Sequence, residues 1–327
     1  MGIPIFFVHR TDSEYLRFTL AQAHFTNPTS TVHLLGDASN KHYDFVEHHE
    51  IREFEDFEFR NRYLHLSPNS FEYELFCFER WFVLRNFVKA ARIEGEFIYL
   101  DSDVMVFSDL SEESGYWTDF DLTVCGEMGP EYTYFKNVSV LESFCDFMLG
   151  MYGNDDTRKE LQLEFDRYVA SEGYIGGGIC DMRLLARFKD AIASRVLDLD
   201  RVNERGGIFN HNINGSDGYL IDSIFNIKYI EKLGDEMFLV DEKSRRRVRL
   251  LAAHFQGLAK KHIPVMYQGP SLASLSSGRG DNPSAEGFEK NVRFRQALFS
   301  FPAIRRSSCI RAIRDAGAAL RRTLHRS

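Results

Sequence analysis

Residues 97–110, FIYLDSDVMVFSDL, place two aspartates between two apolar runs. Residues 97–100 predict a buried strand, and the second apolar run begins at Val104, after Asp101 and Asp103. Open α/β sheets bind ligands beyond the carboxyl ends of their strands. Because side chains alternate along extended backbone, a slight bend would bring both carboxylates onto one ion, and such oxygen ligands suit Mg²⁺ or Mn²⁺. A loop whose acids cap a turn has the same pattern, so the two aspartates alone do not define a site.

The sequence before this stretch predicts alternating strands and helices. Residues 3–8 form an apolar run typical of a buried strand, residues 16–23 carry apolar side chains at helical spacing, and residues 31–35 predict a second strand. Strands joined through a helix run parallel, so this segment is expected to open a parallel sheet. Residues 71–92 carry aromatic and aliphatic residues on one face, which predicts a long core-facing helix. The predicted fold class is therefore α/β, with an open sheet flanked by helices.

Three later segments continue this pattern. Residues 121–126 predict a strand, and residues 173–185, GYIGGGICDMRLL, predict a glycine-rich turn that leads through a short strand into a helix. Residues 248–253 predict a final strand that delivers HFQGLAKK at residues 254–261.

The HFQGLAKK segment offers a second group of functional side chains. A neutral imidazole at His254 could complete the metal site, especially for Mn²⁺, although a single histidine at a strand end is more often structural. Gly257 permits a tight turn, and Lys260 or Lys261 can reach a phosphate. Together with the two aspartates, this segment would supply a metal and a cation for one diphosphate.

These two motifs resemble those of the GT-A glycosyltransferases, most closely glycosyltransferase family 8 and its bacterial relatives, over roughly residues 3–262. The resemblance implies a GT-A (Rossmann-like) fold with a mixed open sheet flanked by helices. It implies a hexosyltransferase that moves a sugar from a nucleotide-sugar, commonly a UDP-sugar, to a glycan or lipid-linked acceptor with retention of configuration. It would make Asp101, Asp103 and His254 ligands of Mn²⁺ or Mg²⁺, and Lys260 the lysine at the diphosphate.

Further positions match the family's donor site. Arg80 resembles the arginine on the helix before the aspartate motif, and residues 174–178, YIGGG, resemble the small-residue segment beside the donor sugar, where glycine allows close backbone approach. Asp222 resembles an acidic segment of the family, although its spacing to the next asparagine differs. His9 and Asp12 follow the first strand, where GT-A proteins bind base and ribose. The expected donor-binding residues are His9, Asp12, Arg80, Asp101, Ser102, Gly177, Gly178, Gly257 and Lys260.

The stereochemical outcome and the reaction class leave alternatives open. An inverting enzyme would need a general base near the acceptor hydroxyl, and Asp181 or Asp222 could serve as this catalytic residue. A phosphohydrolase of the haloacid dehalogenase type also places two aspartates after an apolar strand, with Asp101 as the nucleophile. A GT-A domain that binds a nucleotide or glycan without turning it over is the third alternative.

Charge divides the chain into an acidic body and a basic tail. The 327 residues carry 40 Lys and Arg against 48 Asp and Glu, a formal net charge of −8, which argues against a basic nucleic-acid binder. Residues 301–327 contain seven Arg and one Asp, a balance of +6, which leaves −14 for residues 1–300. The five Cys form no CxxC pair, and no apolar run has the length of a membrane span or a signal peptide, so a cytoplasmic protein is expected.

The sequence predicts a catalytic domain at residues 1–270, a linker or mobile loop at residues 271–287 and a basic helical extension at residues 288–327. The extension combines a narrow apolar stripe with many arginines, which is typical of a helix lying on anionic lipid. Peripheral attachment to the inner face of the membrane through residues 303–327 is therefore expected. Packing on the catalytic domain or binding to an acidic partner would use the same helix.

Overall fold

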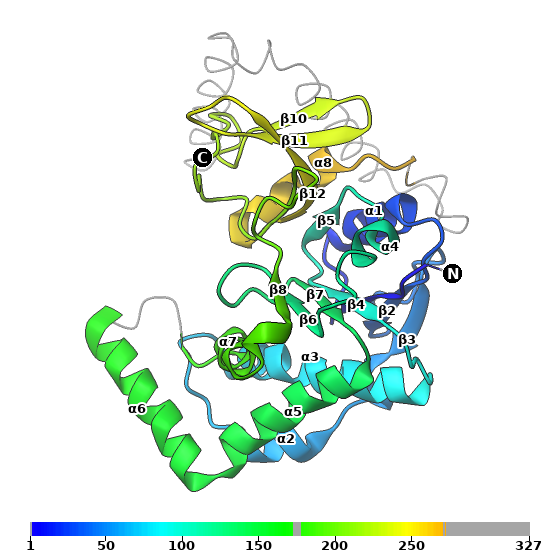
Figure 1. Ribbon diagram of the computed structural model, residues 1–327. Coiled ribbons are helices and arrows are strands. Elements are labelled where there is room, and N and C mark those ends of the chain that lie inside the picture. Colours follow the sequence, from blue (N-terminus) through cyan, green and yellow to red (C-terminus); the bar gives the residue numbers. More distant parts are fainter. Residues whose placement is uncertain (1, 173–177, 271, 273–327) are drawn as a thin grey trace, which may run out of the picture.

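The computed structural model describes residues 2–172, 178–270 and 272, which form two sheets and the helices around them (Figure 1). The strands are β1 (Ile5–Val8), β2 (Val32–Gly36), β3 (Glu47–Glu50), β4 (Phe97–Leu100), β5 (Val104–Val106), β6 (Leu122–Val124), β7 (Tyr132–Phe135), β8 (Val196–Asp198), β9 (Gly207–Asn210), β10 (Ile230–Leu233), β11 (Glu236–Val240) and β12 (Arg247–His254). The α-helices are α1 (Leu16–Thr26), α2 (Phe57–Arg62), α3 (Phe71–Ala90), α4 (Leu110–Ser114), α5 (Val138–Gly153), α6 (Asp155–Glu172), α7 (Asp181–Ala191) and α8 (Ile263–Met266). Short 3₁₀ helices are η1 (Ile51–Glu53), η2 (Ala193–Arg195) and η3 (Gly257–His262).

The larger sheet has seven strands in the order β3-β2-β1-β4-β7-β6-β8. β1 pairs in parallel with both β2 and β4, as the β-α-β pattern predicts, whereas β7 runs antiparallel to β4. β1, β4 and β7 are buried along their whole length, which explains why their sequences are continuous apolar runs. The predicted α/β class, a mixed open sheet flanked by helices, is confirmed.

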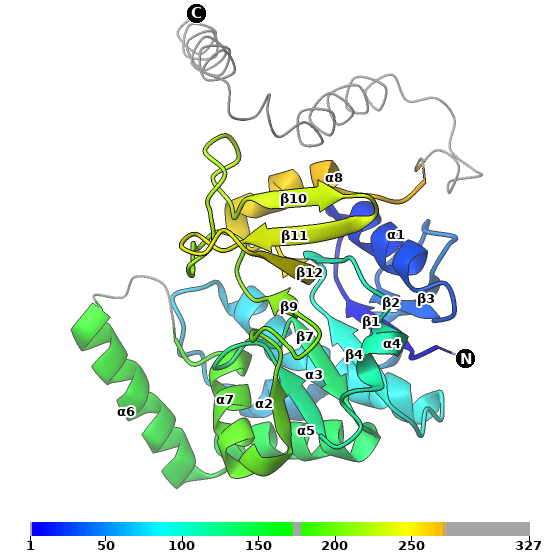
Figure 2. The same ribbon diagram turned by 45° about the horizontal axis from the view of Figure 1, so that its top comes forward.

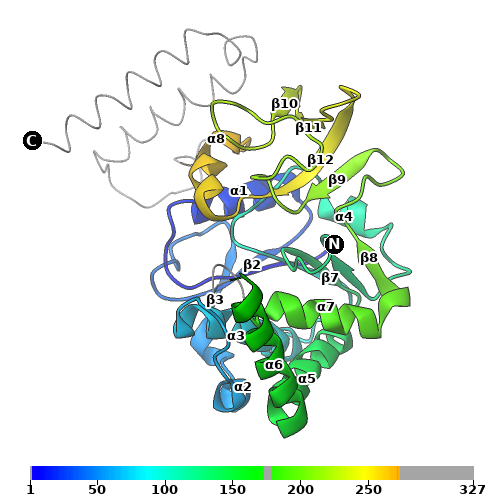
Figure 3. The same cartoon turned by 90° about the vertical axis from the view of Figure 1, so that its left-hand side faces the viewer.

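Helices cover both faces of this sheet (Figures 1 and 3). On one face, α3, α5 and α7 enclose an aromatic core in which Trp81 is fully buried and the rings of Phe97 and Phe135 stack with centroids 5.3 Å apart. On the other face, α1 and α4 bury Leu20 and Leu110 against the sheet. The predicted long helix at residues 71–92 is confirmed as α3, which ends two residues earlier.

The smaller sheet has the order β10-β11-β12-β5, and β9 also pairs with β12. Figure 2 shows the β10 and β11 hairpin beside β12, with α8 next to this sheet. β5 and β12 run antiparallel, and their register places His254 opposite Val104. Because β4 belongs to the larger sheet and β5 to the smaller one, residues 101–103 cross from one sheet to the other. This crossing brings the predicted aspartate motif next to the end of β12.

Two predictions need correction or lie outside the described residues. The sequence predicts a short strand before α7 within residues 173–185. Residues 178–180, the described residues directly before α7, form no strand, so the prediction is wrong there. Gly177, the predicted linker apart from residue 272, and the basic extension lie outside the described residues. None of the described helices combines the length and the apolar character that crossing a bilayer would require.

Candidate active site

Asp101, Asp103 and His254 come together where the two sheets meet. His254 Nε2 lies 3.1 Å from Asp103 Oδ1 and 4.0 Å from Asp101 Oδ2. One ligand atom of each residue lies within 4.8 Å of the others. Asp103 and His254 are 7% and 8% exposed, so the protein holds both side chains in place before any ligand arrives. The structure therefore assembles the three residues that the sequence motifs select.

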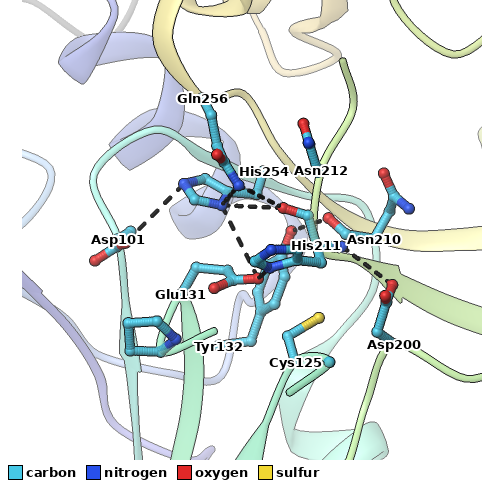
Figure 4. Close-up of polar contacts among 12 residues, drawn as sticks. Asp101, Cys125, Glu131, Tyr132, Asp200, Asn210, His211, Asn212, His254 and Gln256 are labelled. Atoms are coloured by element: carbon cyan, nitrogen blue, oxygen red, sulfur yellow. Dashed lines mark hydrogen bonds and ion pairs between the residues drawn. The ribbon is translucent and has the colours of Figure 1, made fainter. Parts of the chain in front are cut away.

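The orientation of His254 is set by its second ring nitrogen. Nδ1 donates to the main-chain carbonyl of His211 at 3.1 Å, which leaves Nε2 facing the carboxylates (Figure 4). A main-chain carbonyl can only accept a hydrogen bond, so Nδ1 carries the proton. Protein metal sites commonly fix a histidine ligand in this way. Two carboxylates and one imidazole nitrogen form a donor set that fits Mn²⁺ or Mg²⁺.

Lys260 stands on the other side of Asp103. Its Nζ lies 3.1 Å from Asp103 Oδ2 and 5.2 Å from the centre of the Tyr15 ring, and its side chain is 38% exposed. Gly257 begins the turn that carries Lys260 and has a φ of +53°, a region that glycine enters without strain. Lys261 instead lines a cavity of about 450 Å³ with Phe225 and Leu258, so Lys260 is the lysine that reaches the aspartate motif.

Arg80 joins Asp101 to α7. Its guanidinium donates to Asp101 Oδ1 at 2.6 Å and to Asp181 Oδ2 at 2.7 Å. Trp81 Nε1 donates to the same oxygen of Asp181 at 2.9 Å, and the Tyr99 hydroxyl donates to Asp101 Oδ1 at 2.6 Å. The two carboxylates raise the pKa of Arg80 well above its usual value, although burial acts to lower it. Asp181 is 3% exposed and is thus placed to hold Arg80 and, through it, Asp101.

His9 and Ser102 border the site next to Lys260. Burial and the charge of Lys260 lower the pKa of His9 to about 4, so its ring is neutral at neutral pH. The His9 and Tyr15 ring centres lie 6.1 Å apart, and the Tyr15 hydroxyl is 3.4 Å from Ser102 Oγ. Asp12 accepts a hydrogen bond from Tyr43 and lies 3.6 Å from His42 Nε2.

Gly178 and Asp222 have local structural roles in the described contacts. A Cβ at Gly178 would lie 2.5 Å from the Leu66 carbonyl oxygen, so glycine permits close backbone packing against residues 66–67. Asp222 Oδ1 accepts from the main-chain N–H of Ile224 at 2.8 Å and of Phe225 at 3.1 Å, which holds the turn at residues 222–227. Contact of either residue with a donor or acceptor stays a prediction.

Three further residues, Glu131, His211 and Lys228, support the site, and no sequence pattern marked them as site residues. Glu131 is fully buried, and its Oε1 lies 2.6 Å from His211 Nδ1 and 3.9 Å from His254 Nδ1 (Figure 4). The hydrogen bond to Glu131 raises the pKa of His211. Lys228, also buried, donates to the Asn212 carbonyl at 2.6 Å and so fixes the loop that carries His211. The only sequence signal is the polar run FNHNING at the end of an apolar strand.

The contact between His254 and Asp103 makes the metal-free protein sensitive to alkaline pH. Burial lowers the pKa of His254, but the charge and hydrogen bond of Asp103 outweigh it and raise this pKa to about 9. A group with a raised pKa contributes stability below its unfolded value of about 6.5 and loses it as the pH rises through its folded value. We expect the free energy of unfolding to fall by about 2–3 kcal/mol between pH 6 and pH 10.

Urea unfolding in the presence of a chelator measures this effect, and His254→Gln is the control. The other titrating groups are common to both proteins. The contribution of His254 is therefore the fall in the free energy of unfolding of the wild type between pH 6 and pH 10 minus the fall for the variant. Parallel pH curves for the two proteins would show that His254 is not charged in the folded state.

The fold and the site together describe an α/β protein in which two carboxylates and a histidine that could hold a metal ion lie between two sheets. Its fold is similar to mouse xyloside xylosyltransferase 1 (10% identity, 64% of this chain, 87% of that chain, TM-score 0.38). It is also similar to galactosyltransferase LgtC in complex with donor and acceptor sugar analogs (12% identity, 87% of this chain, 99% of that chain, TM-score 0.41). A third similar structure is glycosyltransferase GlyE of Streptococcus pneumoniae (14% identity, 89% of this chain, 64% of that chain, TM-score 0.36). No protein-family model and no curated protein sequence matches the chain. At these scores the similarity concerns the general fold, so the function is inferred from the site's own residues.

Proposed function

We propose that this protein is a metal-dependent glycosyltransferase that moves a sugar from a nucleotide-sugar, commonly a UDP-sugar, to a glycan or glycolipid acceptor with retention. The observation that carries the proposal is the meeting of Asp101 and Asp103 with His254 and Lys260, which lie about 150 residues later in the chain. Three oxygen or nitrogen ligands and a partly exposed ammonium group at one point suit a metal-bound diphosphate.

The charges at the site support a diphosphate ligand. Asp101, Asp103 and Asp181 supply three negative charges, and Arg80 and Lys260 supply two positive charges. With His254 neutral as a ligand, the site has a net charge of −1, and a divalent cation changes this to +1. The loaded site would attract an anionic diphosphate. In the metal-free site, where His254 is charged at neutral pH, the net charge is zero and this attraction is absent.

Glycosyl transfer breaks the bond between the sugar and the diphosphate, so negative charge grows on the leaving group. A cation held by Asp101, Asp103 and His254 would act as a Lewis acid on that diphosphate. Lys260 would donate to the same leaving oxygens, because its Nζ stands beside Asp103 and its side chain is partly open to solvent. Arg80 holds Asp101 in position through the hydrogen bond to its Oδ1.

The phosphohydrolase alternative requires Asp101 as a nucleophile. Asp101 Oδ1 instead accepts hydrogen bonds from both Arg80 and Tyr99 at 2.6 Å. Two such bonds lower the nucleophilicity of that oxygen and suit a carboxylate that serves as a fixed ligand. Glycosyl transfer is therefore the function that these contacts favour.

Thermal unfolding with UDP, GDP and CDP, each with and without Mn²⁺, tests the donor site. A nucleotide at 100 times its dissociation constant should stabilise the protein by about 2.7 kcal/mol. We expect a shift with one nucleotide, UDP, only when Mn²⁺ is present, followed by slow hydrolysis of the matching nucleotide-sugars. Metal-independent shifts, or phosphatase activity on simple phosphomonoesters, would contradict the proposal.

The proposed membrane attachment rests on the arginine content of residues 303–327, which lie outside the described residues. Deleting them should release the protein from anionic vesicles and spare activity on soluble acceptors. Unchanged sedimentation with the vesicles would reject this part of the proposal.

A further inference from the structure

A second group of metal-ligating side chains lies on β2 and β3, at the edge of the larger sheet. β2 and β3 are parallel, with His33 opposite Glu47 and Leu35 opposite His49. Because side chains two apart in a strand share a face, His33, Glu47 and His49 project from the same face of the sheet. Leu35 belongs to the core beneath α3, which identifies that face.

Aromatic neighbours fix the two imidazoles. The His33 ring stacks on Phe6 with centroids 4.8 Å apart and an angle of 11° between the planes. The centroid of His49 lies 4.3 Å from that of Phe87 near the end of α3, and Phe87 also contacts His33. His33 is only 8% exposed, so its ring has little freedom to turn. The protein therefore holds both rings in orientation without any bound ion.

Two of the three separations between the ligand atoms match a tetrahedral centre. His33 Nδ1 lies 3.2 Å from His49 Nε2 and 3.3 Å from Glu47 Oε2, and the three ligand atoms are within 4.8 Å of one another. Zn²⁺ binds imidazole and carboxylate at about 2.0–2.1 Å in tetrahedral geometry, which separates neighbouring ligand atoms by about 3.3–3.4 Å. The two separations from His33 agree with this value to within about 0.2 Å, and ion binding would bring Glu47 and His49 closer to each other.

One hydrogen bond from His33 explains the positions of Glu47 and His49 less completely than a shared metal ion does. His33 Nδ1 faces both His49 Nε2 and Glu47 Oε2 at similar distances, and one N–H can serve only one of them well. Burial and the neighbouring His49 lower the pKa of His33 to about 4, so this imidazole is in the neutral form that binds metals. Glu47 has a side chain that is 62% exposed and gives an ion a route from solvent.

We propose that His33, His49 and Glu47 bind one Zn²⁺-class ion in tetrahedral geometry, with the fourth position open to water. Two imidazoles and one carboxylate prefer Zn²⁺ over Mg²⁺ or Ca²⁺, which favour all-oxygen ligand sets. The ion cross-links the edge strand β3 to β2. β3 has the sequence EHHE and buries no residue fully, so this link replaces the apolar packing that the strand lacks.

Zinc binding to the full-length chain tests the proposal. All proteins compared carry Asp103→Asn, which disables the candidate site at Asp101, Asp103 and His254, so that zinc bound there is not counted. The Asp103→Asn protein is dialysed against Zn²⁺ and its bound zinc is compared with that of two double variants. One adds His49→Gln, and the other adds His48→Gln as a matched control. His48 is the neighbouring residue on β3, points to the opposite face and lies 3.0 Å from Asn40 Oδ1.

We expect His49→Gln to remove one equivalent of zinc and His48→Gln to remove none. Co²⁺ added in place of Zn²⁺ should give intense visible absorption bands of a tetrahedral ion, and His49→Gln should abolish them. Circular dichroism checks that both variants fold. Equal zinc content in the two double variants, or weak octahedral Co²⁺ bands in the Asp103→Asn protein, would overturn the proposal.

Discussion

We expect Asp103→Asn to lower the proposed glycosyl transfer by on the order of 10³-fold and to remove the proposed Mn²⁺-dependent stabilisation by nucleotide. Asp103 contacts His254 through one carboxylate oxygen and Lys260 through the other. The asparagine keeps the size of the side chain but removes the charge that contacts Lys260 and that would hold the cation. Initial rates with the donor, and thermal shifts with the nucleotide that stabilises the wild type, measure the two effects.

Asp119→Asn is the matched control for this prediction. Asp119 is an exposed carboxylate in the loop after α4, so the same chemical change there should leave both readouts at wild-type values. An Asp103→Asn protein with an unchanged Mn²⁺-dependent shift would place the cation elsewhere. A lost shift with unchanged turnover would show that the metal binds without taking part in the reaction.

The three residues of the candidate metal site could be located from the sequence because they stand at the ends of apolar strands. β4 is buried on both faces, so Phe97 to Leu100 appear as an uninterrupted apolar run and mark where Asp101 must lie. The same holds for the run that ends at His254. Sequence therefore identified both motifs, whereas their meeting depends on the antiparallel pairing of β5 with β12. Pairing between strands this far apart leaves no local pattern in either one.

Elements with polar sequences could not be predicted in this way. β3 and β10 are partly exposed edge strands, and their sequences, EHHE and IEKL, lack the apolar runs that mark a buried strand. Glu131 and His211 support His254 from two separate segments. Glu131 is an isolated polar residue and His211 lies in a short polar run, and only the folded chain shows that the two form a pair. The same reason hides the metal-ligating group at His33, whose partners lie on one of these polar strands.

The second large effect concerns Arg80, whose replacement by methionine should lower the free energy of unfolding by about 3–5 kcal/mol. The guanidinium compensates both Asp101 and Asp181. Methionine fills a similar volume but leaves Asp181, 3% exposed, as a buried carboxylate without its cation. Chemical denaturation measures the loss. Arg85→Met is the control, since the described ion pair of Arg85 is with Asp56, whose side chain is 23% exposed and can be solvated in its place.

A double variant separates the loss of charge compensation from the loss of packing. Asp181→Asn removes the buried charge and keeps an acceptor for Trp81 Nε1, which donates to Asp181 at 2.9 Å. If the penalty comes from an uncompensated carboxylate, Arg80→Met combined with Asp181→Asn should be more stable than Arg80→Met alone, with a coupling energy of about 1–3 kcal/mol. Additive losses would instead assign the effect of Arg80 to its packing between Trp81 and Tyr99, against whose rings its guanidinium lies at 5.2 and 5.3 Å. If charge compensation is the cause, the two substitutions must be coupled, because Asp181 has little access to water that could solvate its carboxylate in place of the arginine.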